Sequence, residues 1–189
     1  MTALLLKQNE LDSGALRRAM GRFATGITVI SAQHQEQIHA MTANAICTIS
    51  FDPLIVMVCV NKKARMGDFI QQAGHFAVNI LAEEQEIISR HFAGAGQEQA
   101  PEGLNFEIIE DCPVLDGTLA AVACKVDKVL DSGDHFMILG QVMAVRYQEE
   151  AEKPLLYYRG RYHHLESSDT RNTPEVWLDS GMRIYYEEW

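Results

Sequence analysis

The pattern of hydrophobic positions predicts that most of this chain is extended. Residues 27–32 are rich in β-branched side chains, a polar turn follows at residues 33–37, and a second extended segment runs toward Ala45. This order of segments predicts a β-hairpin. A continuous apolar run at residues 54–60 is too short for a typical helix and predicts a strand covered on both faces.

Helical periodicity is confined to brief segments. The pattern predicts three short helices, at residues 12–25, 64–73 and 83–92. In the first, apolar residues recur at three- and four-residue steps, namely Leu16, Ala19, Met20 and Phe23. Asp12 or Ser13 is the expected N-cap of this helix, and Gly26 and Gly74 are the expected stops of the first and second helices.

The second half of the chain is almost entirely β in pattern. Further strands are expected at residues 75–81, 119–130, 136–147 and within 155–165. Turns are expected at residues 131–134 and at Arg159-Gly160, and residues 94–103 read as an exposed loop without periodicity. Many strands with few short helices favour an antiparallel barrel with peripheral helices over a doubly wound parallel sheet.

Length and composition fit one globular domain. The chain has 189 residues, of which 47% are hydrophobic and 22% charged, so it has none of the charge excess of a disordered chain. A net charge of −10 argues against nucleic acid and anionic membranes as partners, since both require clustered Lys and Arg.

The cysteines and the N-terminus indicate a reduced, cytoplasmic protein. No Cys-x-x-Cys pair occurs, and we expect four reduced core thiols, at Cys47, Cys59, Cys112 and Cys124. No basic segment precedes an apolar stretch at the N-terminus, and the longest apolar run is far too short to span a bilayer. We therefore expect a cytoplasmic location.

Common catalytic motifs are absent from the sequence. The one Gly-x-Gly, at Gly94 and Gly96, follows a predicted helix and lacks the third glycine of a Rossmann fingerprint. Neither a Walker lysine motif nor a Gly-x-Ser-x-Gly elbow is present. His163 and His164 are adjacent in a predicted strand and point to opposite faces, so we expect no metal site.

Three segments have features that could serve a flavin nucleotide. A run of mostly small residues ends the second predicted strand, and it would let backbone amides approach a flat heterocycle closely. These residues are Met41, Thr42, Ala43, Asn44 and Ala45. A cationic helix start could hold a phosphate, at Asn61, Lys62, Lys63, Ala64 and Arg65. His135 follows directly after a turn. Taken singly, the three segments also fit a tight strand exit, a solvated helix start and a structural histidine.

Taken in order, six blocks of sequence resemble one known family. The blocks are residues 21–30 (GRFATGITVI), 41–45 (MTANA), 49–53 (ISFDP), 76–81 (FAVNIL), 133–135 (GDH) and 158–162 (YRGRY). They resemble the flavin reductase component of two-component flavin-dependent monooxygenases, and most closely the reductases of phenol and 4-hydroxyphenylacetate hydroxylases. The resemblance covers roughly residues 14–165, so we assign a domain to residues 1–165 and leave the tail 166–189 outside it.

The resemblance implies an antiparallel Greek-key split barrel that binds flavin, a homodimer, and reduction of FMN or FAD by NADH or NADPH. The reduced flavin would pass to a separate monooxygenase. The cofactor-binding residues it implies are Met41, Thr42, Ala43, Asn44, Ala45, Ser50, Phe51, Cys59, Val60, Asn61, Lys63, Ala64, Arg65, Phe92, His135 and Tyr162. Among them, His135 is the implied catalytic residue, which would orient the nicotinamide.

Several alternatives stay open at the level of sequence. Many relatives carry a hydroxyl residue near position 64 and a second proline near position 54, where this chain has Ala64 and Leu54, so FMN and FAD remain equal candidates. A reductase of the same fold could use ferric iron or a corrinoid as its acceptor. A flavin or haem carrier without catalysis and a structural partner subunit are the other interpretations.

Overall fold

The protein is built mainly from antiparallel strands. The computed structural model describes residues 5–94, 100–149 and 153–165, so the expected tail 166–189 and part of the expected loop at 94–103 lie outside the described residues. The helices are η1 (Gln8–Glu10), α1 (Ser13–Met20), α2 (Arg65–Ala73), η2 (Glu83–Gln85) and α3 (Glu86–Phe92). The strands are β1 (Thr25–Gly26), β2 (Thr28–His34), β3 (Gln37–Ala43), β4 (Ile46–Phe51), β5 (Leu54–Asn61), β6 (His75–Ile80), β7 (Phe106–Ile109), β8 (Cys112–Leu115), β9 (Ala120–Ser132), β10 (His135–Tyr147), β11 (Leu156–Tyr158) and β12 (Arg161–His163).

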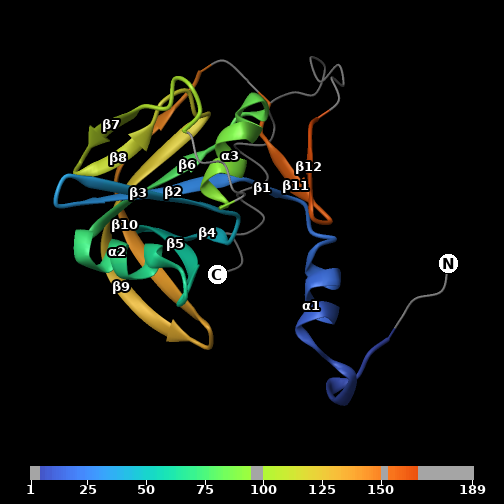
Figure 1. Cartoon of the computed structure of the whole chain (residues 1–189). Coiled ribbons are helices and arrows are strands. Elements are labelled where there is room, and N and C mark those ends of the chain that lie inside the picture. Colours follow the sequence, from blue (N-terminus) through green and yellow to red (C-terminus); the bar gives the residue numbers. More distant parts are fainter. Residues whose placement is uncertain (1–4, 95–99, 150–152, 166–189) are drawn as a thin grey trace.

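One seven-stranded sheet forms the body of the molecule (Figure 1). Its order is β3-β2-β6-β9-β10-β5-β4, and every neighbouring pair is antiparallel. The two edge strands, β3 and β4, are consecutive in the chain and only Asn44 and Ala45 join them. Because a residue spans at most about 3.5 Å, so short a link brings the two edges together at this corner and curls the sheet into a barrel with a split. The predicted fold class is confirmed.

The expected hairpins are present, with tighter turns than the sequence suggested. The β2–β3 turn consists of Gln35 and Glu36, which both have positive φ angles, 48° and 62°. The β9–β10 turn consists of Gly133 and Asp134, so that His135 lies opposite Ser132 in the ladder. Both are two-residue turns, which join antiparallel strands most directly.

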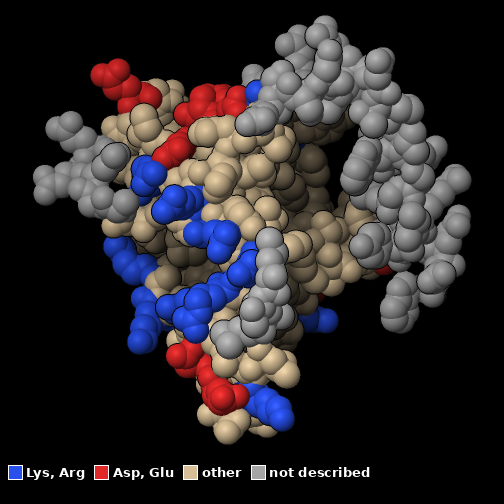
Figure 2. Space-filling view, turned by 90° about the vertical axis from the view of Figure 1, so that its right-hand side faces the viewer, with Lys and Arg blue, Asp and Glu red and all other residues tan. Residues whose placement is uncertain are grey.

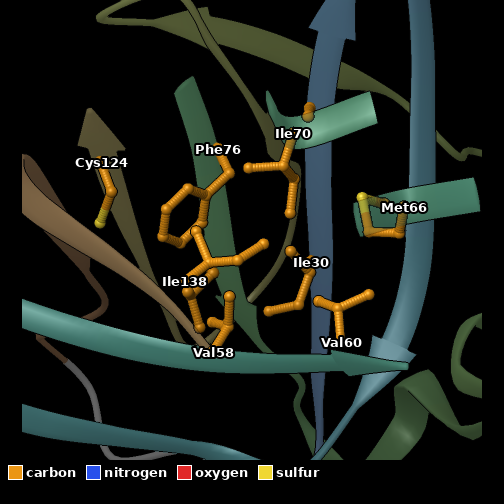
Figure 3. Packing of buried hydrophobic residues seen from close by; sticks show 10 residues of the cluster. Ile30, Val58, Val60, Met66, Ile70, Phe76, Cys124 and Ile138 are labelled. Atoms are coloured by element: carbon orange, nitrogen blue, oxygen red, sulfur yellow. The ribbon is translucent and has the colours of Figure 1, made fainter. Parts of the chain in front are cut away.

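The interior of the barrel is filled by aliphatic and aromatic side chains. Figure 3 shows side chains from the strands directed toward one another, among them Ile30, Val58, Phe76 and Ile138. From one side, α2 contributes Met66 and Ile70, both fully buried. Each such side chain stabilises the fold by about 1.5–3 kcal/mol through removal of apolar surface from water. This packing fixes α2, and therefore its first turn, against the barrel.

Gly140 on β10 is required by the packing of Phe76. A Cβ atom at position 140 would lie 2.5 Å from the Cζ atom of Phe76 and 2.8 Å from the Cβ atom of Cys124. Contacts this short would force packed groups to shift. The Cβ atom of Cys124 has little freedom to move, because it is bonded directly to the backbone. The glycine thus lets a large ring fill the barrel where three strands converge.

No local pattern predicts the β7–β8 hairpin, and a buried asparagine explains its position. Asn79 on β6 donates from Nδ2 to Val29 O (2.9 Å) and to Ser31 Oγ (2.8 Å), and its Oδ1 accepts from Leu115 N (2.8 Å). Ser31 Oγ in turn donates to Pro113 O. The hairpin is therefore held on the barrel by polar contacts between residues far apart in sequence.

Three expectations about exposure are wrong in the single chain. The first helix ends at Met20 rather than Thr25, and its apolar residues Leu16 and Met20 are 63% and 59% exposed. Cys47 is exposed and Cys59 half-buried, although Cys112 and Cys124 are buried as expected. The strand β5 buries Val58 and Val60 fully, but its other face stays partly open and Leu54 is 48% exposed. In each case the described part of the chain leaves an apolar surface uncovered.

Candidate functional site

The small-residue segment lies at the split of the barrel. Ala43 ends β3, and its carbonyl oxygen accepts a hydrogen bond from Thr28 Oγ1 at 2.7 Å. Asn44 Nδ2 donates to Thr25 Oγ1 at 3.1 Å, and Ala45 O accepts from Cys59 N at 2.9 Å. These bonds hold a backbone that has almost no side-chain bulk. A flat ring can therefore approach the chain closely where the two sheet edges meet.

Two of the expected residues direct their side chains wholly or partly into the core. Val60 is fully buried in the core, and Met41 packs partly against the same core cluster. Ser50 and Phe51 end β4, where Ser50 Oγ accepts from Asp52 N at 3.2 Å, and Phe51 is 42% exposed. Near the split, Asn44 and Phe51 are exposed and Ser50 is half-buried, while Val60 can meet a ligand only through its main chain.

The corner between β5 and α2 combines a tight turn with an uncapped helix start. Asn61 Oδ1 accepts from Lys63 N at 2.9 Å, and Asn61 O accepts from Ala64 N at the same distance. Ala64 is the N-cap of α2 and has no side chain to accept from the first amides of the helix. Uncapped amides and the positive end of the helix dipole together favour an anion.

Of the three cationic side chains at this corner, one forms an ion pair and two are exposed. Lys62 Nζ lies 2.5 Å from Asp131 Oδ1 and 2.7 Å from Gly133 O, and sits over the Phe136 ring. Lys63 and Arg65 are exposed, and within the described part of the chain neither has a carboxylate within 4.0 Å. The cluster of Lys and Arg around a hollow in Figure 2 shows that positive side chains gather on one face despite the net charge of −10.

His135 belongs to this same corner. It pairs with Asn61 in the register of β10 on β5, and its Nδ1 lies 2.7 Å from Asp134 Oδ1. The hydrogen bond from His135 holds the pKa of the Asp134 carboxyl below its usual range. The exposed carboxylate orients the imidazole, whose other nitrogen is left to meet a ligand.

A second group of residues meets on α3. Thr42 Oγ1 donates to Ser89 O at 2.7 Å, and Ser89 Oγ lies 3.0 Å from Tyr162 Oη. The Arg90 guanidinium lies 4.7 Å above the Tyr162 ring, and Phe92 packs edge-on against Phe106. A chain of contacts therefore links β3 to β12 through the buried Ser89. Sequence reasoning missed Ser89 and Arg90 because their partners lie up to 73 residues away.

Two groups of the predicted site residues lie apart within one chain. His135, Asn61, Lys63, Ala64 and Arg65 lie at the β5–α2 corner, whereas Phe92 and Tyr162 lie beside α3 and β12. Figure 1 shows β12 and the turn between β9 and β10 at separate places on the molecule. The structure records no contact between His135 and Tyr162, which were expected to face the same nicotinamide.

The Cys59 thiol is half-buried. Burial raises the pKa of the Cys59 thiol, and the neighbouring Cys47 adds to that shift. Cys59 therefore stays protonated near neutral pH. Among the described residues, no three His, Cys, Asp or Glu side chains lie together as a metal-binding group, and no helix is long and apolar enough to cross a membrane.

Comparison with known proteins defines the class. Residues 20–166 match the family described as the flavin reductase like domain, and the chain belongs to this family. The chain is 37% identical over 154 residues to an NADH-dependent flavin reductase of Rhodococcus sp, covering 80% of this chain and 85% of that protein. It is 34% identical to the reductase component of 4-hydroxyphenylacetate 3-monooxygenase of Thermus thermophilus, covering 80% of this chain and 95% of that protein.

Solved structures agree with this assignment. The native flavin reductase PheA2 has a TM-score of 0.77 and 39% identity, covering 83% of this chain and all of that one. The NADH:FAD oxidoreductase SgcE6 of Streptomyces globisporus has a TM-score of 0.78 and 29% identity, covering 88% of this chain and 99% of that one. The resemblance inferred from the six sequence blocks is confirmed.

Proposed function

We propose that this chain is an NAD(P)H:flavin oxidoreductase that reduces FMN or FAD with NADH or NADPH. The single observation that carries the proposal is that a small-residue strand exit is bonded to β5, through Ala45 O and Cys59 N, close to the uncapped, cationic helix start that follows β5. The first suits a flat ring and the second suits its phosphate. The relatives named as flavin reductases support the same reaction.

The residues of the chain would bind and position, because the flavin and the nicotinamide themselves supply the hydride chemistry. Thr42, Ala43, Asn44 and Ala45 would line the isoalloxazine, and Ser50 and Phe51 the ribityl chain. Lys63, Arg65 and the first amides of α2 would hold the phosphate. Fixing both rings in a reactive orientation accounts for much of the rate that such an enzyme can add.

His135 and Tyr162 would contact the nicotinamide. We infer that His135 donates a hydrogen bond that orients the ring rather than shuttling a proton. Tyr162, held by Ser89 and Arg90, would form a wall against which the nicotinamide packs. Phe92 would flank the flavin from α3.

The chain would act as a homodimer. Three apolar side chains at the N-terminal end point to solvent, namely Leu16, Met20 and Phe23, the last with 70% of its surface exposed. Ile49, Phe51 and Leu54 form a second exposed apolar group on β4 and β5. Exposed apolar residues gathered in this way mark association surfaces. A second copy would cover them and could bring its own Tyr162 near the His135 of the first, which a single chain does not do.

Sedimentation of the purified chain tests the dimer. The wild type should sediment as a dimer, and Phe23→Ser should shift it toward the monomer. Ile108→Ser serves as the matched control, because Ile108 is a half-exposed apolar residue on β7, away from α1. A monomeric wild type, or equal dissociation by both variants, would contradict the dimer.

The reduced flavin would leave the protein and serve a separate monooxygenase, as the names of several relatives imply for those proteins. Reduction by NADH or NADPH would take place in the cytoplasm. Binding of flavin must therefore be moderate in at least one redox state, because a tightly held product could not reach the oxygenase.

An anaerobic experiment tests the proposed reaction. The protein is mixed with FMN or FAD, NADH or NADPH is added, and bleaching of the oxidised flavin band is followed. Fast bleaching in proportion to enzyme concentration is the expected result, and the faster pairs identify both substrates. Flavin binding without bleaching would indicate a carrier, and bleaching that needs ferric iron or a corrinoid would indicate another acceptor.

A further inference from the structure

Arg90 places a positive charge directly against the Tyr162 ring, the wall to which the nicotinamide is assigned. Its guanidinium carbon lies 4.7 Å from the centroid of that ring. Glu86, one turn earlier on α3, fixes the guanidinium: its Oε1 accepts from Arg90 Nε at 2.7 Å and lies 2.6 Å from Nη2. Within residues 5–94, 100–149 and 153–165, no cation other than Arg90 is recorded over this ring.

Tyr162 is also held by contacts that do not involve Arg90. Its Oη lies 3.0 Å from Ser89 Oγ, and its ring packs against Tyr157 at a centroid distance of 5.6 Å and an interplanar angle of 70°. Figure 1 shows β12, which carries Tyr162, near α3. A change of charge at Arg90 can therefore alter the field at the ring while these contacts keep the ring in place.

The other charged groups near Arg90 pair with one another. Glu86 Oε2 lies 3.9 Å from His164 Nε2, and His164 Nδ1 lies 3.7 Å from Glu83 Oε2. Lys153 Nζ lies 4.0 Å from the other oxygen of Glu83. Arg90 is therefore the charge that meets the Tyr162 ring, and Glu86 is its counter-charge.

The two redox states of a nicotinamide differ in the charge of the ring. The reduced ring of NADH or NADPH is neutral. When it gives a hydride to the flavin, it loses two electrons with one proton and becomes a pyridinium cation, while the flavin gains that hydride. Release of the product in the proposed reaction thus begins with a cationic ring at Tyr162.

A cation already placed on Tyr162 makes this wall less favourable for the oxidised ring. The quadrupole of a tyrosine ring attracts a cation, and Arg90 already uses that attraction. Aromatic rings in contact have centroids about 4.5–7 Å apart, so a nicotinamide against Tyr162 would lie within about 12 Å of the guanidinium. Because the Debye length is about 8 Å at physiological ionic strength, salt screens this repulsion only in part. Both effects act far less on the neutral reduced ring.

We propose that Arg90 discriminates between the two redox states of the nicotinamide, because its charge disfavours the oxidised ring at Tyr162 and so promotes release of NAD+ or NADP+. The inference rests on the proposed flavin reductase function, in which Tyr162 meets the nicotinamide. That function by itself gives Arg90 only the task of holding Tyr162. Glu86 acts through Arg90, as a positioning residue that also moderates its charge.

The test measures one ratio for the full-length protein at saturating flavin, namely the inhibition constant Ki of NAD+ divided by the KM of NADH. Arg90→Met removes the positive charge and leaves Glu86, so the ratio should fall about threefold, a change expected for an exposed cation–π contact. Glu86→Gln keeps an acceptor for Arg90 Nε but removes the counter-charge, so the ratio should rise about threefold. Arg90→Lys keeps the charge and should keep the ratio of the wild type. If NADPH is the better substrate, the same ratio is measured with NADP+ and NADPH.

Lys128→Met is the matched control for a change of net charge. Lys128 is an exposed residue on β9, and it belongs to neither group of site residues. Its loss removes one positive charge, as Arg90→Met does, and should leave the ratio unchanged. Thermal unfolding of each variant identifies a loss that comes from misfolding, and Arg90→Gln replaces Arg90→Met if the latter is unstable.

Opposite shifts of the ratio in Arg90→Met and Glu86→Gln support the inference. An ion pair with a purely structural role would move the ratio in the same direction in both variants or leave it unchanged, and either result overturns the inference while the reductase function stands. A shift of the same size in Lys128→Met would also overturn it, because the effect would then come from net charge. If the wild type does not oxidise NADH or NADPH with flavin as acceptor, the proposed function itself fails.

Discussion

The β5–α2 corner and the α3–β12 cluster are built in different ways, although both would serve one reaction. The corner is formed mainly by backbone amides and exposed cations within five consecutive residues, Asn61 to Arg65. The cluster is formed by side chains from three distant segments, joined through the buried Ser89. A phosphate needs only local donors and charge, whereas a nicotinamide wall needs rings held at a fixed angle. Residues 61–65 should therefore govern flavin binding, and Ser89, Arg90 and Tyr162 the use of NADH.

The largest effect is expected from reversing a charge at the corner. Arg65→Glu should weaken FMN binding about 100-fold, since it removes a charge-assisted contact worth about 1.5–3 kcal/mol and adds repulsion. Riboflavin, which has no phosphate, should bind the variant as it binds the wild type. Fluorescence titration with both flavins makes the comparison. Equal losses for FMN and riboflavin would mean that Arg65 does not meet the phosphate.

A variant in the barrel core serves as a reference for a loss of stability that leaves ligand binding unchanged. Gly140→Ala should lower the free energy of unfolding by about 1–3 kcal/mol, because the new methyl group overlaps the Phe76 ring. Urea unfolding measures this change. At temperatures where the variant is folded, its FMN affinity and its KM for NADH should match the wild type. A stability equal to that of the wild type would show that Phe76 has room to move.

A smaller and more selective effect is expected at the cluster. Ser89→Ala removes the hydroxyl that holds Tyr162, which corresponds to about 1 kcal/mol for one hydrogen bond. The KM for NADH should rise about fivefold, while the Kd for FMN stays unchanged because Thr42 bonds to the Ser89 carbonyl rather than its hydroxyl.

The double variant Ser89→Ala with Tyr162→Phe sharpens this prediction. If the two groups act through their mutual bond, the double variant should behave like either single variant, and a double-mutant cycle measures the coupling. Additive effects, or a loss of FMN affinity in Ser89→Ala, would contradict the division of labour between the two regions.

The smallest effect concerns the missing cap of α2. Ala64→Ser adds a side-chain oxygen that can accept from the first amides of the helix, and should stabilise the protein without ligand by about 0.5–1 kcal/mol. Thermal unfolding with and without FMN measures the change. If a phosphate already uses those amides, the gain should shrink when FMN is bound. A gain of the same size in both states would place the phosphate elsewhere.

The same contrast explains how much the sequence could predict. The strands, the hairpins and the α2 start follow from local patterns, so their predictions are confirmed within a few residues. The β7–β8 hairpin was missed because Asn79, 36 residues from Leu115, holds it on the barrel. Ser89 and Arg90 were missed for the same reason, since nothing near them in the sequence indicates Tyr162.

Exposure was the least predictable property. Leu16 and Met20 follow a good amphipathic pattern, yet their apolar face meets no core among residues 5–94, 100–149 and 153–165. A hydrophobic pattern shows that a face needs cover but does not show whether the same chain provides it. The two separated groups of predicted site residues fit the same interpretation, since residues expected at one ligand lie apart in one copy.

A crystal structure of the protein with bound flavin tests the central claim most directly. We predict that the isoalloxazine lies against residues 42–45 at the split and that its phosphate meets the amides at the start of α2 and the side chains of Lys63 and Arg65. A flavin bound elsewhere, with its phosphate away from α2, would contradict the account.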